Sequence, residues 1–208
     1  MTNIFTKTIL FFLLSFSVNG EDKKKILFLG DSLTAGFGVE QELAYPNLVR
    51  NKIDKKKLPY TILNAGVSGN TSAGGLRRIN WYFKTQVDII IIALGANDGL
   101  RGLPVKSTEE NLQKIIDAAR LKNPKLKIIL AGMKVPPNMG KKYSEGFTTI
   151  FPRLAKKNNC ELIPFLLEKV AGLKDKNLAD GIHPNPAGHR QIAENVMKVL
   201  GPLIQIKK

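Results

Sequence analysis

The third of five apolar β-type segments, residues 87–94, is apolar at seven of its eight positions. A strand that is apolar on both faces belongs in a sheet that is covered on both sides. Segments with helical spacing separate the five, and this alternation predicts an α/β fold in which helices cover both faces of a parallel sheet. The predicted strands are Ile26–Leu29, Tyr60–Leu63, Val87–Leu94, Lys127–Leu130 and Glu161–Phe165.

Two of the intervening helices carry start signals. Residues 107–110 read Ser-Thr-Glu-Glu, a capping box, and apolar residues follow at helical spacing up to Ala119. Asn185 is a candidate cap for the last helix, with Pro186 at its first position. There is no internal repeat, low-complexity linker or break in composition, so the sequence predicts one folded domain.

The N-terminus has the features of an export signal. Lys7 precedes an apolar run of ten residues, 9–18, and small residues occupy positions 18 and 20. A membrane anchor is the alternative, but a spanning helix needs about 20 apolar residues. We therefore expect residues 1–20 to be a cleaved signal peptide, residues 21–208 to form the mature domain, and the protein to be periplasmic or secreted.

The composition is that of a folded protein, with 43% hydrophobic and 24% charged residues, but the formal net charge is +15. Its lysine runs, at 23–25, 55–57, 141–142 and 156–157, are scattered and form no single basic helix. Solvated faces are the simpler explanation, and we expect no nucleic-acid partner. A salt-sensitive contact with anionic membrane lipid stays open. We expect a monomer, in which the single cysteine, Cys160, is a buried free thiol.

Small and polar residues follow the first three predicted strands, in segments 30–34, 64–70 and 95–98. In open parallel sheets, ligands bind outside the carboxyl ends of the strands. These three loops are therefore the first place to look for a functional site.

Ser32 has the setting of a serine nucleophile, because it follows an apolar strand and precedes a segment that can begin a helix. Its hydroxyl needs a base to take the proton, and the base needs a third group to fix its tautomer. His183 is the favoured base because Asp180, three residues earlier, can reach its ring Nδ1–H. The other histidine, His189, has no such carboxylate and is expected to be a surface or packing residue.

Three donors are candidates for stabilising an oxyanion. They are the backbone N–H of Ser32, the backbone N–H of Gly69 and the side-chain amide of Asn97. Taken singly, a Gly or an Asn after a strand is usually a turn former. The case rests on all of these residues occurring together.

In this order, the segments Gly30-Asp31-Ser32-Leu33, the Gly69 loop, Gly95-Ala96-Asn97-Asp98 and Asp180-x-x-His183 resemble the four sequence blocks of the SGNH, or GDSL, hydrolase family. The resemblance runs from residue 26 to about 200 and is closest to the bacterial periplasmic branch of multifunctional thioesterases, lysophospholipases and arylesterases. Ala96 departs from that branch, which commonly has a second Gly there.

The resemblance implies that Ser32, Asp180 and His183 form a catalytic triad and that Ser32, Gly69 and Asn97 form the oxyanion hole. It also implies a three-layer, flavodoxin-like α/β/α fold around a five-stranded parallel sheet, with no metal and no cofactor. Acids that flank these residues, Asp31 and Asp98, have no metal-ligand spacing around them. We expect them to bond to backbone N–H groups of the loops.

An apolar loop follows Asn97, and its residues Leu100, Leu103, Pro104 and Val105 are the candidate wall for an acyl chain, although packing of the loop onto the domain would also explain them. The aromatic run 81–83 is expected to pack on a helix face. The hypothesis is therefore a serine esterase of the arylesterase, acyl-CoA thioesterase or lysophospholipase type, which hydrolyses acyl esters or thioesters through an acyl-enzyme. A carbohydrate acetylesterase with the same triad and a non-enzymatic basic envelope-binding protein are the alternatives.

Overall fold

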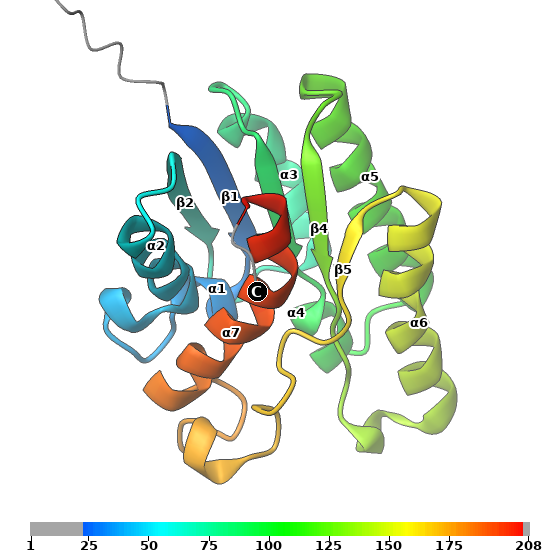
Figure 1. Ribbon diagram of the computed structural model, residues 1–208. Coiled ribbons are helices and arrows are strands. Elements are labelled where there is room, and N and C mark those ends of the chain that lie inside the picture. The colour runs from blue at the N-terminus through cyan, green and yellow to red at the C-terminus, as the bar shows by residue number, and fades with distance from the viewer. Residues whose placement is uncertain (1–22, 206–208) are drawn as a thin grey trace, which may run out of the picture.

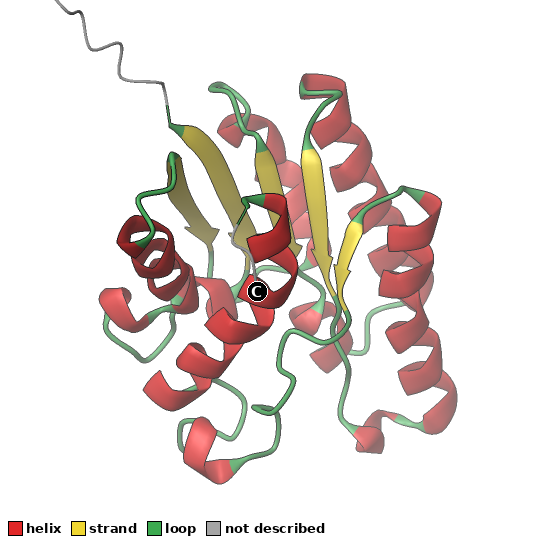
Figure 2. Ribbon diagram, viewed as in Figure 1, coloured by secondary structure: helices red, strands yellow, loops and turns green. Residues whose placement is uncertain are grey.

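A computed structural model describes residues 23–205 as one five-stranded parallel sheet between two layers of helices (Figure 2). The predicted signal peptide, residues 1–20, lies outside the described residues. No helix within 23–205 is long and apolar enough to cross a membrane. The strands are β1 (Lys24–Gly30), β2 (Tyr60–Gly66), β3 (Ile89–Ala93), β4 (Lys127–Ala131) and β5 (Glu161–Ile163).

The strand order across the sheet is β2-β1-β3-β4-β5, which is the flavodoxin-like order. The chain moves outward from β1 to β2 and then crosses back to place β3 on the other side of β1. Because crossovers between parallel strands are right-handed, this reversal sends the connecting helices to opposite faces. Residues 26–30 of β1 pair with β2 on one side and with β3 on the other, which places the end of β1 between the ends of the next two strands.

In Figure 1, α2 and α7 cover one face of the sheet, and α3, α5 and α6 cover the other. The inner surfaces of both layers form one core with the strands, among them the fully buried Ile90, Ile91 and Ile92 of β3. The helices are α1 (Ser32–Ala35), α2 (Tyr45–Lys55), α3 (Ser72–Tyr82), α4 (Ala96–Leu100), α5 (Val105–Lys122), α6 (Lys141–Lys157) and α7 (Pro186–Leu203), with short 3-10 turns η1 (Gln41–Leu43), η2 (Pro137–Met139) and η3 (Lys174–Lys176).

The sequence predicted all five strands, but two of them are shorter than expected. In residues 87–94 only Ile89–Ala93 pair as β3, although Val87 and Leu94 are also buried. In residues 161–165 pairing ends at Ile163. Pro164 has no N–H to continue the ladder, which accounts for the early end.

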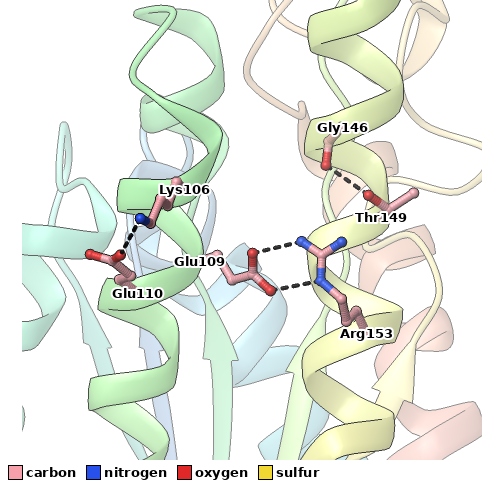
Figure 3. A network of polar contacts seen from close by, with 6 residues as sticks. All are labelled: Lys106, Glu109, Glu110, Gly146, Thr149 and Arg153. Carbon is pink, nitrogen blue, oxygen red and sulfur yellow. Dashed lines mark hydrogen bonds and ion pairs between the residues drawn. The ribbon is translucent and has the colours of Figure 1, made fainter.

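The predicted capping box at residues 107–110 is wrong. Helix α5 begins at Val105, and its N-cap, Pro104, makes no side-chain capping bond. Figure 3 shows the glutamates engaged elsewhere: Glu110 faces Lys106 on the same helix, and Glu109 forms a two-point ion pair with Arg153 of α6. The carbonyl of Pro104 already accepts the N–H groups of Ser107 at 3.0 Å and Thr108 at 3.2 Å, so helical bonding begins before the box.

Two other local predictions have opposite outcomes. The Asn185 cap is confirmed, because its side-chain oxygen accepts the N–H groups of Ala187 and Gly188. Packing of the aromatic run fails at Trp81, whose side chain is 65% exposed, while Tyr82 and Phe83 do pack against the core. Trp81 lies in the last turn of α3, two residues after the buried Ile79 and so about 200° around the helix from it, which turns its side chain to solvent.

Helix α1 lies very close to the end of β2. A Cβ atom added at Gly66 would lie 2.1 Å from the backbone nitrogen of Ala35. Ala35 belongs to α1, which begins at Ser32, so its backbone nitrogen cannot move away without displacing that helix. The absence of a side chain at Gly66 therefore sets the position of Ser32.

We predict that Gly66→Ala lowers the free energy of unfolding by about 1 to 3 kcal/mol, the usual cost of forcing atoms into a packed site. Urea denaturation measures this. Gly146→Ala in α6 is the matched control, because its added Cβ would meet Val105 at an ordinary 3.8 Å. The control should be neutral or stabilising by up to about 1 kcal/mol. Equal effects at both positions would contradict the close approach.

Candidate active site

Ser32 is the first residue of α1 and follows directly on β1. Asp31 caps the helix: its carboxylate accepts the N–H of Leu33 at 3.0 Å. The Ser32 side chain is nearly buried, and its N–H lies in the first helical turn, where backbone donors have no helical partner. The start of α1 thus presents a hydroxyl and a free donor at the carboxyl edge of the sheet.

His183 and Asp180 lie in the loop before α7, and they meet Ser32 across 151 residues of sequence. The Ser32 hydroxyl lies 3.1 Å from His183 Nε2, and His183 Nδ1 lies 2.6 Å from an Asp180 carboxylate oxygen. A proton on Nδ1, donated to Asp180, leaves Nε2 free to accept the proton of Ser32. The structure therefore brings the three predicted residues into one hydrogen-bonded line.

Asp180 is held ionised by the loop around it. Its second carboxylate oxygen accepts the backbone N–H groups of Ile182 and His183, both at 2.9 Å. These bonds and the bond from the His183 ring lower the pKa of Asp180 to about 2. The carboxylate is thus charged at any pH at which an imidazole can act as a base.

The His183 loop is fixed to the segment before it by backbone bonds. Leu178 N–H donates to His183 O at 2.7 Å, and Asn185 N–H donates to Lys176 O at 3.0 Å. The side chain of Asn185 also donates to Asp175 O. Asn185 therefore both caps α7 and holds the loop that carries the histidine.

The two remaining predicted donors are Gly69 and Asn97. Gly69 is exposed and has φ of +77°, a conformation that favours glycine. It lies in a turn, and among residues 23–205 no protein group accepts its N–H. Asn97 donates one amide hydrogen to Asn70 O at 3.0 Å, and the other has no acceptor among the residues that the structure describes. That bond ties the Asn97 side chain to the loop of Gly69.

Asp31 and Asp98 bind backbone N–H groups, as expected from the sequence. Asp98 is 1% exposed and accepts the N–H of Ser72 at 2.7 Å, and Thr108 donates to its other oxygen at 3.3 Å. It thereby fixes the residue next to Asn97 to α3 and α5. Asp31 is fully buried, and one of its oxygens has no hydrogen-bond partner within residues 23–205. Burial raises the pKa of Asp31 to about 7.

Sequence reasoning missed Arg78. Its guanidinium donates to Gly30 O at 2.7 Å, to Ala65 O at 2.8 Å and to the side-chain oxygen of Asn70 at 2.9 Å. One side chain of α3 thus holds the ends of β1 and β2 and the loop of Gly69 together. No spacing rule could have found it, because its partners come from three separate segments and two are backbone carbonyls.

Phe37 was also missed. Its ring lies against the His183 ring, with centroids 4.4 Å apart, although its side chain is 49% exposed. The contact depends on the left-handed turn at Gly36, which ends α1 and returns the chain toward the site. A lone aromatic after a glycine gives no such signal in the sequence.

His189, the rejected base, is fully buried in α7 and accepts the N–H of Tyr45 at 3.3 Å on Nδ1. Burial lowers its pKa to about 4, so the ring is neutral. The packing role expected for His189 is confirmed.

Cys160, expected to be buried, is half-buried beside Arg120.

The apolar loop after Asn97 is partly open to solvent. Leu100, Leu103 and Pro104 are exposed, whereas Val105 lines a cleft of about 600 Å³ at the start of α6. Met139, Tyr143 and the lysines at 141 and 142 share that cleft. Tyr143 holds the loop by donating its hydroxyl to Leu103 O at 2.8 Å.

Among residues 23–205, no three His, Cys, Asp or Glu side chains converge as metal ligands.

The family model described as the GDSL-like lipase/acylhydrolase family matches residues 28–191. An arylesterase of Vibrio mimicus is 37% identical over 193 residues, which cover 92% of this chain and 94% of that protein. A protein named thioesterase 1/protease 1/lysophospholipase L1, from Escherichia coli, is also 37% identical, over 86% of this chain and 84% of its own length.

Solved structures agree with these sequence matches. The crystal structure of TesA superposes with a TM-score of 0.83 and 35% identity, covering 86% of this chain and 99% of the other. The psychrotrophic esterase EstA from Pseudoalteromonas sp., solved with the inhibitor monoethylphosphonate, gives a TM-score of 0.82 at 32% identity, over 88% and 100% of the two chains. The fold is a three-layer α/β fold with a flavodoxin-like sheet, and it is the fold of hydrolytic enzymes. The chain belongs to the GDSL-like lipase/acylhydrolase family.

The buried carboxyl of Asp31 predicts an unusual pH dependence of stability. The folded protein keeps this proton up to about pH 7, whereas the unfolded chain releases it near pH 3.8. Asp31 should therefore reduce stability as the pH rises from about 4 to 7, by at most about 4 kcal/mol at 1.4 kcal/mol for each pKa unit. His189 acts in the opposite direction, because its lowered pKa reduces stability as the pH falls from about 6.5 to 4.

Asp31→Asn removes the first effect and leaves the second. Its free energy of unfolding, relative to wild type, should rise between pH 4 and pH 7.5 in urea titrations. Asp175→Asn, at an exposed position in η3, is the control and should show no such rise. A constant difference between Asp31→Asn and wild type across this range would show that Asp31 is ionised in the folded protein.

Proposed function

We propose that this protein is a serine esterase that hydrolyses acyl esters or thioesters through an acyl-enzyme intermediate. The observation that carries the proposal is the hydrogen-bonded line from Asp180 through His183 to Ser32. Its members come from opposite ends of the chain, and packing alone gives no reason for them to meet. Membership of an acylhydrolase family, and relatives named arylesterase and thioesterase, support the same activity.

In the proposed first half-reaction, Ser32 Oγ attacks the carbonyl carbon while His183 Nε2 takes the hydroxyl proton. Asp180 keeps the proton on Nδ1 and stabilises the imidazolium that forms. The carbonyl oxygen becomes an oxyanion, which the N–H groups of Ser32 and Gly69 and the amide of Asn97 stabilise. Removing one such donor typically costs about 2.7 to 4 kcal/mol in the transition state.

The leaving group then departs with the proton carried by His183, and Ser32 remains acylated. In the second half-reaction His183 takes a proton from water, which attacks the acyl carbon. The acid is released, and the proton returns to Ser32. The Phe37 ring lies against the His183 imidazole, which carries the proton in each half-reaction. We therefore assign Phe37 to the wall of the site beside the leaving group.

The distribution of exposed apolar side chains supports an apolar substrate. Among residues 23–205, eight large hydrophobic side chains are exposed, and six of them lie in the segments between a strand end and the next long helix that carry the proposed catalytic groups: Phe37, Val67, Leu100, Leu103, Leu173 and Ile182. Acyl and aryl groups gain free energy on such surfaces, whereas a sugar gains little. This distribution favours an acyl or aryl ester over the substrate of a carbohydrate acetylesterase.

Ser32→Ala should leave the fold intact and reduce kcat by a factor on the order of 10⁶, the usual cost of losing a triad nucleophile. Hydrolysis of p-nitrophenyl butyrate measures this loss, and circular dichroism checks the fold. Ser144→Ala is the control, because that hydroxyl lies in α6 outside the proposed site. A non-enzymatic binding protein would leave the ester intact in wild type as well.

Leu103→Ala tests the proposed acyl wall of Leu100, Leu103, Pro104 and Val105. We expect kcat/KM for octanoyl esters to fall about ten-fold, or about 1.4 kcal/mol, because buried methylene contacts contribute up to about 0.8 kcal/mol each. Acetyl esters, which do not reach the wall, should change little. An equal fall for both substrates would mean that Leu103 only packs the loop.

We further propose that residues 1–20 direct export and are removed, that the enzyme works in the periplasm or medium, and that it is a monomer. Mass spectrometry of the protein recovered from the periplasm should find a chain that begins near Glu21. An intact chain of 208 residues in the membrane fraction would contradict the cleavage.

A further inference from the structure

The charge of the protein is concentrated at one edge of the sheet. The basal edge, as we call it, is where the five strands begin, and it comprises residues 23–25, 54–60, 82–89, 120–127 and 155–161. In Figure 1 it is the end of the molecule at which β1 starts. These segments hold thirteen Lys and Arg residues and only three carboxylates.

The opposite edge carries the active site and has no such excess. The loops that leave the strands there, residues 31–44, 67–72, 94–105, 132–141 and 164–185, hold six Lys and Arg residues and seven carboxylates. The lysine runs that look scattered in the sequence are thus gathered by the fold. Three of the four runs, at 23–25, 55–57 and 156–157, lie at the basal edge.

Two large apolar side chains stand among these cations. Trp81 is 65% exposed and Leu121 is 82% exposed. They lie in the last turns of α3 and α5, which pack against each other and end at the basal edge. The ammonium of Lys84 lies 3.6 Å from the centre of the Trp81 ring. Tryptophan is enriched at membrane–water interfaces, and lysine is attracted to anionic headgroups.

We propose that the basal edge docks on a bilayer rich in anionic phospholipid, with Trp81 and Leu121 at the level of the headgroups. The excess of cations complements the negative surface potential of such a bilayer. Apolar side chains among the cations favour a lipid surface over a nucleic acid, which would offer them no apolar phase. The docked enzyme turns its active-site edge to the water.

This orientation has a consequence for the substrate. A docked molecule meets esters that arrive from the aqueous side and keeps its site away from acyl chains within the same bilayer. The consequence for the substrate rests on the proposed function, whereas the docking itself does not. Binding can be measured without turnover, so a failure of one leaves the other standing.

The test is co-sedimentation of the mature chain, residues 21–208, with vesicles of equal parts phosphatidylglycerol and phosphatidylcholine. We expect binding at 50 mM NaCl, loss of binding at 1 M NaCl, where the Debye length is about 3 Å, and no binding to phosphatidylcholine alone. Failure to bind the anionic vesicles at 50 mM NaCl would overturn the proposal.

Charge-matched variants locate the docking face. The triple variant Lys56→Glu, Lys84→Glu and Lys125→Glu alters exposed basal residues and should weaken binding at least ten-fold. The control, Lys106→Glu, Lys114→Glu and Lys174→Glu, changes the net charge equally, away from that edge, and should bind within about two-fold of wild type. Equal losses in the two variants would mean that net charge alone drives binding, and would overturn the assignment of the face.

Trp81 reports the orientation directly, because it is the only tryptophan in the chain. Its fluorescence should shift to the blue on binding and should be quenched by brominated phospholipid in the vesicles. Binding with unchanged Trp81 fluorescence would place another face on the bilayer. Equally tight, salt-sensitive binding to duplex DNA, again with unchanged fluorescence, would show a general preference for polyanions and would also overturn the proposal.

Discussion

The parallel pairing of β1 with both β2 and β3 is the constraint on which the candidate site depends. Because β1 lies between its two successors, the loops that leave the three strands meet at one edge of the sheet. Ser32, Gly69 and Asn97 each come from one of these loops. Their placement at one edge therefore follows from strand order, and the bonds of Arg78 hold the ends of β1 and β2 and the loop of Gly69 together.

The histidine reaches the same edge from the far end of the chain, and its position depends on polar contacts more than on the sheet. Asn185 caps α7 and holds the preceding loop, so one residue sets the place from which His183 extends. Asp180 then orients the ring, and Phe37 lies against it. One half of the site is built on the ends of three strands, and the other half lies in the loop that polar contacts hold in place before α7.

Much of this could be predicted from the sequence, for reasons that differ by residue. Continuous apolar strands and their alternation with helices indicate the sheet, and the Asp180–His183 spacing indicates a local hydrogen bond. Arg78 and Phe37 could not be found, because their contacts exist only after distant segments have packed. The predicted capping box failed because helical bonding starts earlier, at the carbonyl of Pro104. Trp81 is exposed because it follows the buried Ile79 of α3 by two residues, about 200° around the helix.

The central claim is that Ser32 carries the acyl group between the two half-reactions. Acid quenching during turnover of p-nitrophenyl octanoate, followed by peptide mass spectrometry, tests this most directly. The proposed mechanism predicts one octanoyl group, bound as an ester to the peptide that contains Ser32. An octanoyl group on a different residue, or rapid hydrolysis with no acylated peptide under any quench, would contradict it.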